Sequence, residues 1–197
     1  MFFDLISALC SLLSTYYFIR MNNKAWGIGM IATCLNGGLY WYSGIYADMV
    51  LEAFYFFTMA YGWYKWQEYE NKGHHTLKLK KLSSAQSVVL LSLFLIIFIF
   101  IYATLITLTQ SNIPALDALT TTLSLVAQWL MCHKIILAWG FWFITDAFYV
   151  WLYLTKNLPF HALLMFIYTG MAVMGYLVWT QAARIKEDES RLKNFSV

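Results

Sequence analysis

Long apolar segments separated by short polar connections follow one another along the chain. The clearest of them, Ser87–Thr109, contains no charged side chain. As an α-helix it is long enough to cross the roughly 30 Å of hydrocarbon in a bilayer, and a soluble core has no use for such a segment. The pattern therefore predicts an all-α integral membrane protein. The seven predicted transmembrane helices are 2–19, 25–42, 46–66, 87–109, 117–133, 135–155 and 160–181.

Two parts of the chain resemble each other when position 25 is aligned with position 138. In this gapless alignment of 25–66 with 138–179, identical residues recur from one end to the other. Trp26 thus corresponds to Trp139, and Trp66 corresponds to Trp179. Apolar composition alone would produce a few such matches. Two similar halves in an apolar chain suggest a transporter.

The repeat gives the predicted helices an arrangement of three plus one plus three. We interpret 1–197 as a single membrane domain with a first repeat at 1–66, a linker helix at 87–109 and a second repeat at 117–181. The charged tail at 182–197 is expected to be a short surface helix or disordered. An odd number of crossings separates the two repeats, so both enter the membrane from the same side. Parallel repeats of this kind enclose a shared cleft.

Basic residues predict the orientation of the chain. Charged residues make up only 12% of the chain and hydrophobic ones 61%. With the N-terminus outside, twelve of the thirteen lysines and arginines fall on the inner side, and only Lys156 falls outside. This asymmetry predicts an outer N-terminus and a cytoplasmic C-terminus. The net charge of +3 lies in loops and does not indicate a nucleic-acid partner. The basic connection 67–86 is interpreted as solvated, with contact to anionic lipid as the alternative.

Two acidic residues lie at positions that hydrocarbon should not tolerate. An ionisable group at bilayer depth costs several kcal/mol unless it faces the interior of the bundle, so Asp146 and Glu52 mark a pathway. Helical spacing places aromatic and hydrogen-bonding residues on the faces that carry them. Such a cleft suits a flat, hydroxylated cation, because aromatic faces attract a cationic ring and a carboxylate supplies the countercharge. The candidate substrate-binding residues are Asn36, Tyr40, Glu52, Tyr55, Gln128, Trp139, Trp142, Asp146, Tyr149 and Tyr153.

Several of these residues also have structural interpretations. Tyrosines at these positions can serve packing, and Asn36 and Gln128 can bridge helices. Asp48 lies close to the predicted outer surface, where solvation explains it. Three tryptophans lie near predicted helix ends, where anchoring at the membrane interface is at least as good an interpretation as binding. These are Trp26, Trp66 and Trp179.

The sequence gives little indication of a metal site, a cofactor or an enzyme. The four histidines have no zinc-type spacing, and the three cysteines are scattered among apolar segments, where we interpret them as packing residues. A hydrolytic set of Ser124, His133 and Asp146 is a remote alternative, but Gly-x-Ser-x-Gly and His-Glu-x-x-His motifs are absent. A heptahelical receptor would share the helix count, but the repeat with a central linker argues against it.

Motifs in both halves resemble the Pnu family of vitamin transporters. The first half contains Tyr46–Tyr55 with the sequence YADMVLEAFY and ends in Tyr61–Trp66 with the sequence YGWYKW. In the second half the similar positions are Asp117–Thr121, Trp139, Asp146, Gly175, Tyr176 and Trp179. The resemblance covers essentially the whole chain.

This resemblance implies a helix bundle that is related to the SWEET sugar carriers and usually trimeric. It implies a bacterial inner-membrane facilitator that needs neither ATP nor ion coupling. A cytoplasmic kinase would phosphorylate the imported vitamin and so trap it. Members carry nicotinamide riboside, thiamine or riboflavin.

The chain departs from the family pattern at the two acids. The nicotinamide riboside branch commonly has glutamine at the position of Glu52, and some members have asparagine at the position of Asp146. Both departures add negative charge and favour a cationic substrate. Nicotinamide riboside is our first candidate because of the family resemblance. Thiamine is the alternative, and charge disfavours riboflavin.

Overall fold

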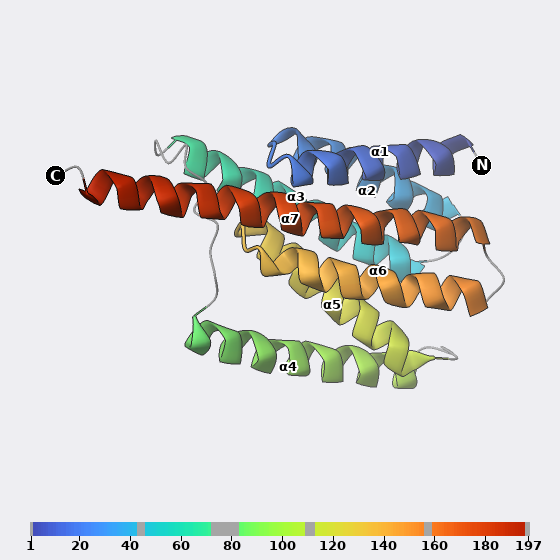
Figure 1. The fold of residues 1–197 in the computed structure, drawn as a ribbon. Helices are drawn as coiled ribbons and strands as arrows, with labels where there is room; N and C mark the ends of the chain where they lie inside the picture. The colour runs from blue at the N-terminus through green and yellow to red at the C-terminus, as the bar shows by residue number, and fades with distance from the viewer. Residues whose placement is uncertain (1, 43–45, 72–82, 109–112, 156–158, 196–197) are drawn as a thin grey trace. The chain divides into compact units, whose positions relative to one another are not determined.

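Helices form the architecture of the protein in a computed structural model, which describes residues 2–42, 46–71, 83–108, 113–155 and 159–195. The connections around Lys78–Lys81 and Lys156 lie outside the described residues. Seven α-helices occur in the described part of the chain (Figure 1). They are α1 (Phe2–Ile19), α2 (Lys24–Tyr42), α3 (Tyr46–Asn71), α4 (Ser84–Leu108), α5 (Pro114–Cys132), α6 (Leu137–Thr155) and α7 (Pro159–Phe195).

Local signals in the sequence explain where several helices begin. The two prolines of the chain, Pro114 and Pro159, are the first residues of α5 and α7, where the missing N–H has no helical partner to lose. Before α4, the Gln86 backbone N–H donates to Ser83 Oγ at 3.3 Å, and the Ser83 N–H donates to Gln86 Oε1 at 3.0 Å. These two bonds form a capping box.

The charged tail is helical, which was one of its two expected forms, but it is not a short helix of its own. The segment after residue 181 is neither a separate surface helix nor disordered, because α7 continues without interruption to Phe195. Its sequence from Ala182 onward contains alanine, glutamate, lysine, arginine and leucine, which favour helices, and no glycine or proline. Loss of hydrophobicity therefore marks the end of the apolar segment but not the end of the helix.

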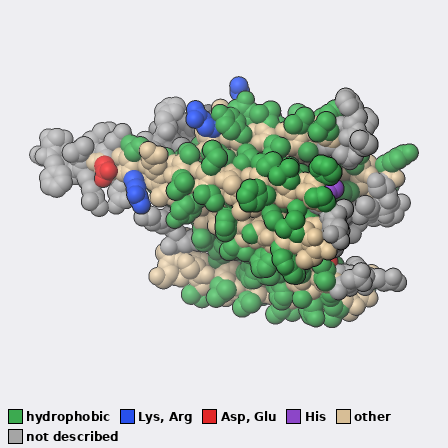
Figure 2. Space-filling model, turned by 45° about the vertical axis from the view of Figure 1, so that its right-hand side comes forward, with side chains coloured by type: hydrophobic (Ala, Val, Ile, Leu, Met, Phe, Trp, Pro, Cys, Tyr) green, Lys and Arg blue, Asp and Glu red, His purple; other side chains and the backbone are tan. Residues whose placement is uncertain are grey.

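Within the residues that the structure describes, four helices are long and apolar enough to cross a membrane: α4, α5, α6 and the part of α7 from Pro159 to Ile185. The most hydrophobic is α4, with a mean hydropathy of 3.0 and no buried residue. Its exposed side chains include Val88, Leu91 and Phe100, which suit contact with lipid. Apolar side chains cover most of the face drawn in Figure 2. The protein is thus an all-α membrane protein, and crossing by α1, α2 and α3 stays a prediction.

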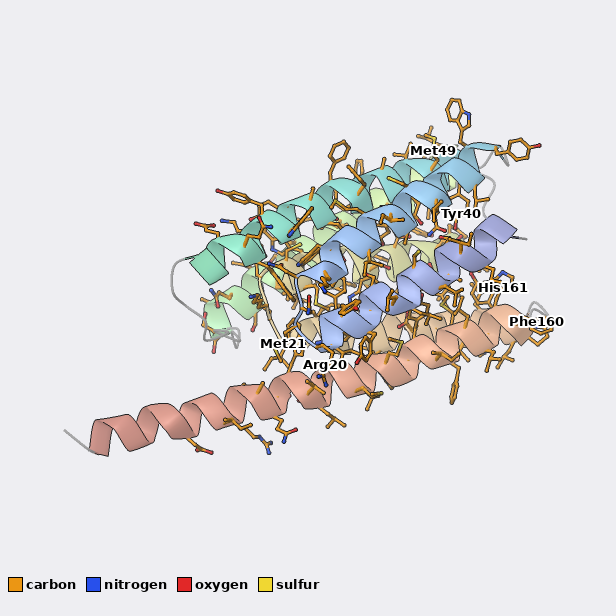
Figure 3. The ribbon with its side chains drawn as sticks, turned by 90° about the horizontal axis from the view of Figure 1, so that it is seen from above. Arg20, Met21, Tyr40, Met49, Phe160 and His161 are labelled. Carbon is orange, nitrogen blue, oxygen red and sulfur yellow. The ribbon has the colours of Figure 1, made fainter. Side chains whose placement is uncertain are left out.

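The chain forms two compact units. The first contains 1–79, 131–134 and 174–197, and the second contains 80–130 and 135–173. In the first unit α1 packs against α2, and α2 packs against α3 (Figure 1). Arg20 and Met21 lie at one end of this bundle, and Tyr40 and Met49 lie at the other (Figure 3). We call these the Arg20 end and the Tyr40 end of the first unit.

The sequence repeat recurs in the backbone. At the offset that aligns position 25 with position 138, both bounds of α2 coincide with those of α6, and the start of α3 coincides with that of α7. The turns that follow α1 and α5 also correspond, because Met21 and Lys134 both adopt a left-handed conformation, with φ of 54° and 56°. Their N–H groups donate to the carbonyls of Phe18 and Met131, at 2.9 Å and 3.1 Å. These bonds belong to a Schellman motif, a common way to end a helix.

Candidate substrate site

A hydrogen-bonded network joins the three N-terminal helices through two predicted site residues and a serine. The Asn36 amide Nδ2 on α2 donates to Glu52 Oε1 on α3 at 3.1 Å. The Ser7 hydroxyl on α1 donates to Asn36 Oδ1. Asn36 thus bridges helices, as the structural interpretation expected, and it does so by contacting the predicted carboxylate. Sequence reasoning missed Ser7, because a single serine in an apolar helix gives no periodic signal.

The other predicted residues of the first unit lie on the same helices. Tyr40 and Tyr55 are both half-buried and both interact with other groups. Tyr40 lies close to the end of α2, at the end of the bundle opposite Arg20 (Figure 3). Asp48 belongs to α3, but its side chain lies outside the described part. The first unit therefore contributes one carboxylate that is already held by an amide.

In the described part of the second unit, Asp146 and Gln128 are predicted site residues with buried polar side chains and unused bonding capacity. Asp146 on α6 is 9% exposed, and no hydrogen bond or ion pair to its carboxylate occurs within the described ranges. Gln128 on α5 is 3% exposed, and its Nε2 has no hydrogen-bond partner there. Buried polar groups normally find partners, and each exception requires an explanation.

Aromatic residues accompany Asp146 along α6. Trp139 is buried, whereas Trp142, Tyr149 and Tyr153 are half-buried. The rings of Tyr149 and Tyr153 stack with centroids 5.9 Å apart, and Tyr153 lies 5.3 Å from the His161 ring at the start of α7. Exposed apolar side chains occupy other positions of the same helix, as expected for a lipid-facing side. These are Leu137, Phe143, Ile144, Trp151 and Leu154.

Tryptophans near the predicted helix ends form a buried cluster, and their interpretation as interface anchors was wrong. Trp26, Trp66 and Trp179 are each 0% exposed, and they belong to the first unit. The Trp66 ring lies 5.3 Å from Trp26, 6.1 Å from Trp179 and 5.9 Å from Phe18. The α1, α2, α3 and α7 helices bring these rings together, so proximity to a helix end did not mean exposure to the membrane interface.

Lys134 was counted among the loop charges, but it is only 5% exposed. Its Nζ lies 4.5 Å from the centroid of the Trp66 ring, which is a cation–π geometry. A buried ammonium needs a compensating environment, and the indole face provides part of it. A single lysine between two apolar segments gives no sign in the sequence that it will be buried.

Ser124 and His133, two residues of the remote hydrolytic alternative, contact other residues in the structure. The Ser124 hydroxyl donates to the Thr120 carbonyl of its own helix at 2.7 Å. His133 belongs to the first unit, where its ring lies 6.0 Å from Tyr61, whereas Ser124 and Asp146 belong to the second. Within the described residues, no group of three or more histidines, cysteines and acids could hold a metal ion.

Comparison with known proteins places the chain in a family. A family model described as "Nicotinamide mononucleotide transporter" matches residues 1–181. The chain belongs to this family. Curated relatives named "Nicotinamide riboside transporter PnuC", from Escherichia coli (strain K12) and Shigella flexneri, are 24% identical over 180 residues. The match covers 79% of this chain and 75% of each relative.

A solved structure supports the fold of this family member. The chain is similar to "Crystal structure of the Vitamin B3 transporter PnuC" with a TM-score of 0.75 and 22% identity. The similarity covers 93% of this chain and 82% of that one. At this level of identity the comparison supports the helical fold alone. The family match and the apolar helices together identify a multi-pass membrane protein of a vitamin-transporter family.

Proposed function

We propose that the chain imports a small cationic vitamin by facilitated diffusion, with nicotinamide riboside as the first candidate. The observation that carries this proposal is the buried carboxylate of Asp146 on α6, which has no partner among the described residues. An isolated carboxylate in a membrane helix costs several kcal/mol. A bound cation offsets that cost, whereas a neutral ligand does not. The carboxylate is therefore the group expected to select charge.

The side chains near Asp146 in the sequence suit a flat ring. Trp139, Trp142, Tyr149 and Tyr153 present indole and phenol groups along α6, and aromatic faces attract cationic rings. The Gln128 amide donor has no partner among the described residues and suits a hydroxyl or carbonyl oxygen of the ligand. We propose that these residues bind the vitamin together with Glu52 and Tyr55 of α3, while Tyr40 and Asn36 close the site.

Two vitamins fit these requirements. The names of the curated relatives and the family resemblance favour nicotinamide riboside, which carries a positive pyridinium ring. Thiamine carries a positive thiazolium ring and is the second candidate. Acids at positions 52 and 146 favour both over riboflavin, because riboflavin has no positive charge to compensate for two carboxylates.

The proposed transport needs no energy source of its own. The sequence has no nucleotide-binding motif, and a cationic substrate accounts for both intramembrane acids without ion coupling. We propose a bacterial inner-membrane homotrimer with an outer N-terminus and a cytoplasmic C-terminus. A cytoplasmic kinase would trap the vitamin by phosphorylation, and one triple-helix repeat would move against the other during transport.

Counterflow in proteoliposomes tests this function. Vesicles loaded with unlabelled nicotinamide riboside or thiamine are diluted into the same labelled compound, and the proposal expects transient accumulation of at least one. The Asp146→Asn variant should lose most of it. Absence of counterflow with both vitamins would refute the proposal. Uphill uptake driven by a proton or sodium gradient in kinase-free vesicles would refute the facilitated mechanism.

A further inference from the structure

The network of Ser7, Asn36 and Glu52 has a definite direction. An ionised carboxylate only accepts hydrogen bonds, so the Asn36 nitrogen must face Glu52 Oε1. The Asn36 oxygen then faces Ser7, whose hydroxyl is the donor. The alternative acceptor for this hydroxyl, the Ala32 carbonyl, lies 3.4 Å away and is a weak competitor. The carboxylate therefore sets the orientation of the amide, and the Ser7 hydroxyl stabilises that orientation by donating to the amide oxygen.

We propose that Ser7 and Asn36 are positioning residues, which hold the Glu52 carboxylate ionised and oriented toward a bound cation. Ser7 is 1% exposed, so it acts through Asn36 and does not contact the vitamin. The inference rests on the proposed function, because it assumes that Glu52 lines the substrate site. It assigns Asn36 to the support of the carboxylate, and it adds Ser7 to the residues that determine selectivity for charge.

A second serine on the same helix provides a matched control. Ser14 is also buried, but its hydroxyl donates to a backbone carbonyl, that of Ala25, at 2.8 Å. Ser7→Ala and Ser14→Ala therefore remove the same atom from similar depth. Only Ser7→Ala should weaken binding of the cationic vitamin, by about fivefold, the usual effect of one net hydrogen bond.

Purified full-length protein in nanodiscs is titrated with the vitamin that counterflow selects and with its uncharged isostere. These isosteres are dihydronicotinamide riboside and the thiophene analogue of thiamine. Ser7→Ala should leave the affinity for the isostere unchanged, and Ser7→Thr should restore the affinity for the cation. In a Glu52→Gln background, Ser7→Ala should cause no further loss of cation affinity. Equal losses for Ser7→Ala and Ser14→Ala, or additive losses with Glu52→Gln, would overturn the positioning role.

The outcome separates this inference from the proposed function. If Glu52→Gln weakens the cation but Ser7→Ala does not, the positioning role falls and the cationic site stands. If neither vitamin gives counterflow, the function falls and the positioning role falls with it.

A different observation concerns the Arg20 end of the first unit. The Trp66 indole N–H donates to the Met131 carbonyl at 3.2 Å, and the Trp179 indole N–H donates to the Phe18 carbonyl at 3.1 Å. In the alignment of position 25 with position 138, the donor Trp66 corresponds to the donor Trp179. The acceptor Phe18 corresponds to the acceptor Met131. Each sequence repeat therefore donates one indole to the helix-ending turn of the other repeat.

The two acceptors occupy equivalent places in their turns. Phe18 O and Met131 O already accept the N–H groups of Met21 and Lys134. Those two residues hold left-handed conformations, which cost about 1 kcal/mol or more for a residue other than glycine. Both bonds are buried, so an N–H that separates from its carbonyl finds no water to replace it. Both bonds join the same two repeats, so movement of one repeat against the other is expected to break them together.

We infer that these crossed tryptophan bonds form a latch that closes the Arg20 end. One bond of the latch joins Trp66, on α3 of the first repeat, to Met131 of the second repeat. The other bond joins Trp179, on α7 of the second repeat, to Phe18 on α1 of the first. Transport that moves one repeat against the other must open it. The inference requires transport but does not depend on which vitamin is carried.

Cys132 is a native reporter for the latch. Its thiol is 0% exposed, follows Met131 directly and donates to the Thr58 carbonyl at 3.5 Å. In a Cys10→Ser and Cys34→Ser background, Trp66→Phe and Trp179→Phe each remove one N–H and keep an aromatic ring. Both should speed modification of Cys132 by a polar thiol reagent by about tenfold, the ratio for roughly 1.4 kcal/mol. Trp63→Phe, on the exposed side of α3, should not.

The Trp179 variant decides the test, because its acceptor is Phe18 and not the neighbour of the reporter. Acceleration by Trp66→Phe alone would show local loosening and overturn the latch, as would no acceleration by either variant. The same tryptophan variants are also made in a protein that keeps Cys10 as its only cysteine. The modification rate of Cys10 in this set detects general loosening of the structure. The latch predicts an unchanged rate at Cys10, and equal acceleration at both cysteines would overturn it.

Discussion

The two carboxylates Glu52 and Asp146 occupy membrane-protein helices but have opposite surroundings. Glu52 accepts from Asn36, which Ser7 holds in turn. Asp146 is buried to 9% exposure and has no such partner in the described part of the chain. The difference indicates that folding alone satisfies the first acid, whereas the second retains a desolvation cost that a ligand can relieve. We therefore propose that Glu52 is a preorganised group and Asp146 a binding group.

The largest effect should come from Asp146→Asn, which removes the charge and keeps the shape. Affinity for the cationic vitamin should fall by about 3 kcal/mol, the upper range for a hydrogen bond to a charged group. Thermal stability of the ligand-free protein should rise, because a buried unpaired charge is gone. Calorimetric titration and thermal unfolding without ligand measure the two quantities. Lower stability with unchanged affinity would show that Asp146 is structural.

Asn36→Leu should have the next largest effect, and on stability. Leucine is nearly isosteric with asparagine, but it leaves the Glu52 carboxylate without its amide donor and the Ser7 hydroxyl without its acceptor. The free energy of unfolding should fall by about 2 kcal/mol. Thermal unfolding in nanodiscs at equal lipid content provides the measurement. A stability equal to wild type would contradict the view that Glu52 is satisfied by the protein.

Gln128→Met sharpens the same comparison in the second unit. The Gln128 Nε2 is buried without a partner among the described residues, so methionine removes an unsatisfied donor at nearly constant volume. Stability without ligand should rise by about 1.5 kcal/mol, opposite in sign to Asn36→Leu, and vitamin binding should weaken. The two variants belong in one unfolding experiment. A loss of stability here would mean that Gln128 bridges helices and does not await a ligand.

Hydrophobic segments predicted the helices well, because a bilayer imposes length and apolarity on any helix that crosses it. The end of α7 at Phe195 was missed because charged residues can continue a helix beyond the membrane. The burial of Trp66 and Lys134 was missed because it depends on which helices meet at the Arg20 end of the first unit. Periodicity placed Asn36 and Glu52 on helix faces, but their hydrogen bond depends on the packing of α2 against α3. The joint site of the two units stays a prediction.

Glu52→Gln should have the smallest effect on stability of the four changes. A glutamine oxygen can still accept from Asn36, so the free energy of unfolding should stay within about 0.5 kcal/mol of wild type. Affinity for the cationic vitamin should fall by about 1 kcal/mol, less than for Asp146→Asn, because the Asn36 amide already offsets part of the Glu52 charge. The uncharged isostere should bind as before. A larger loss for Glu52→Gln than for Asp146→Asn would reverse the assigned roles and make Glu52 the principal cation-binding group.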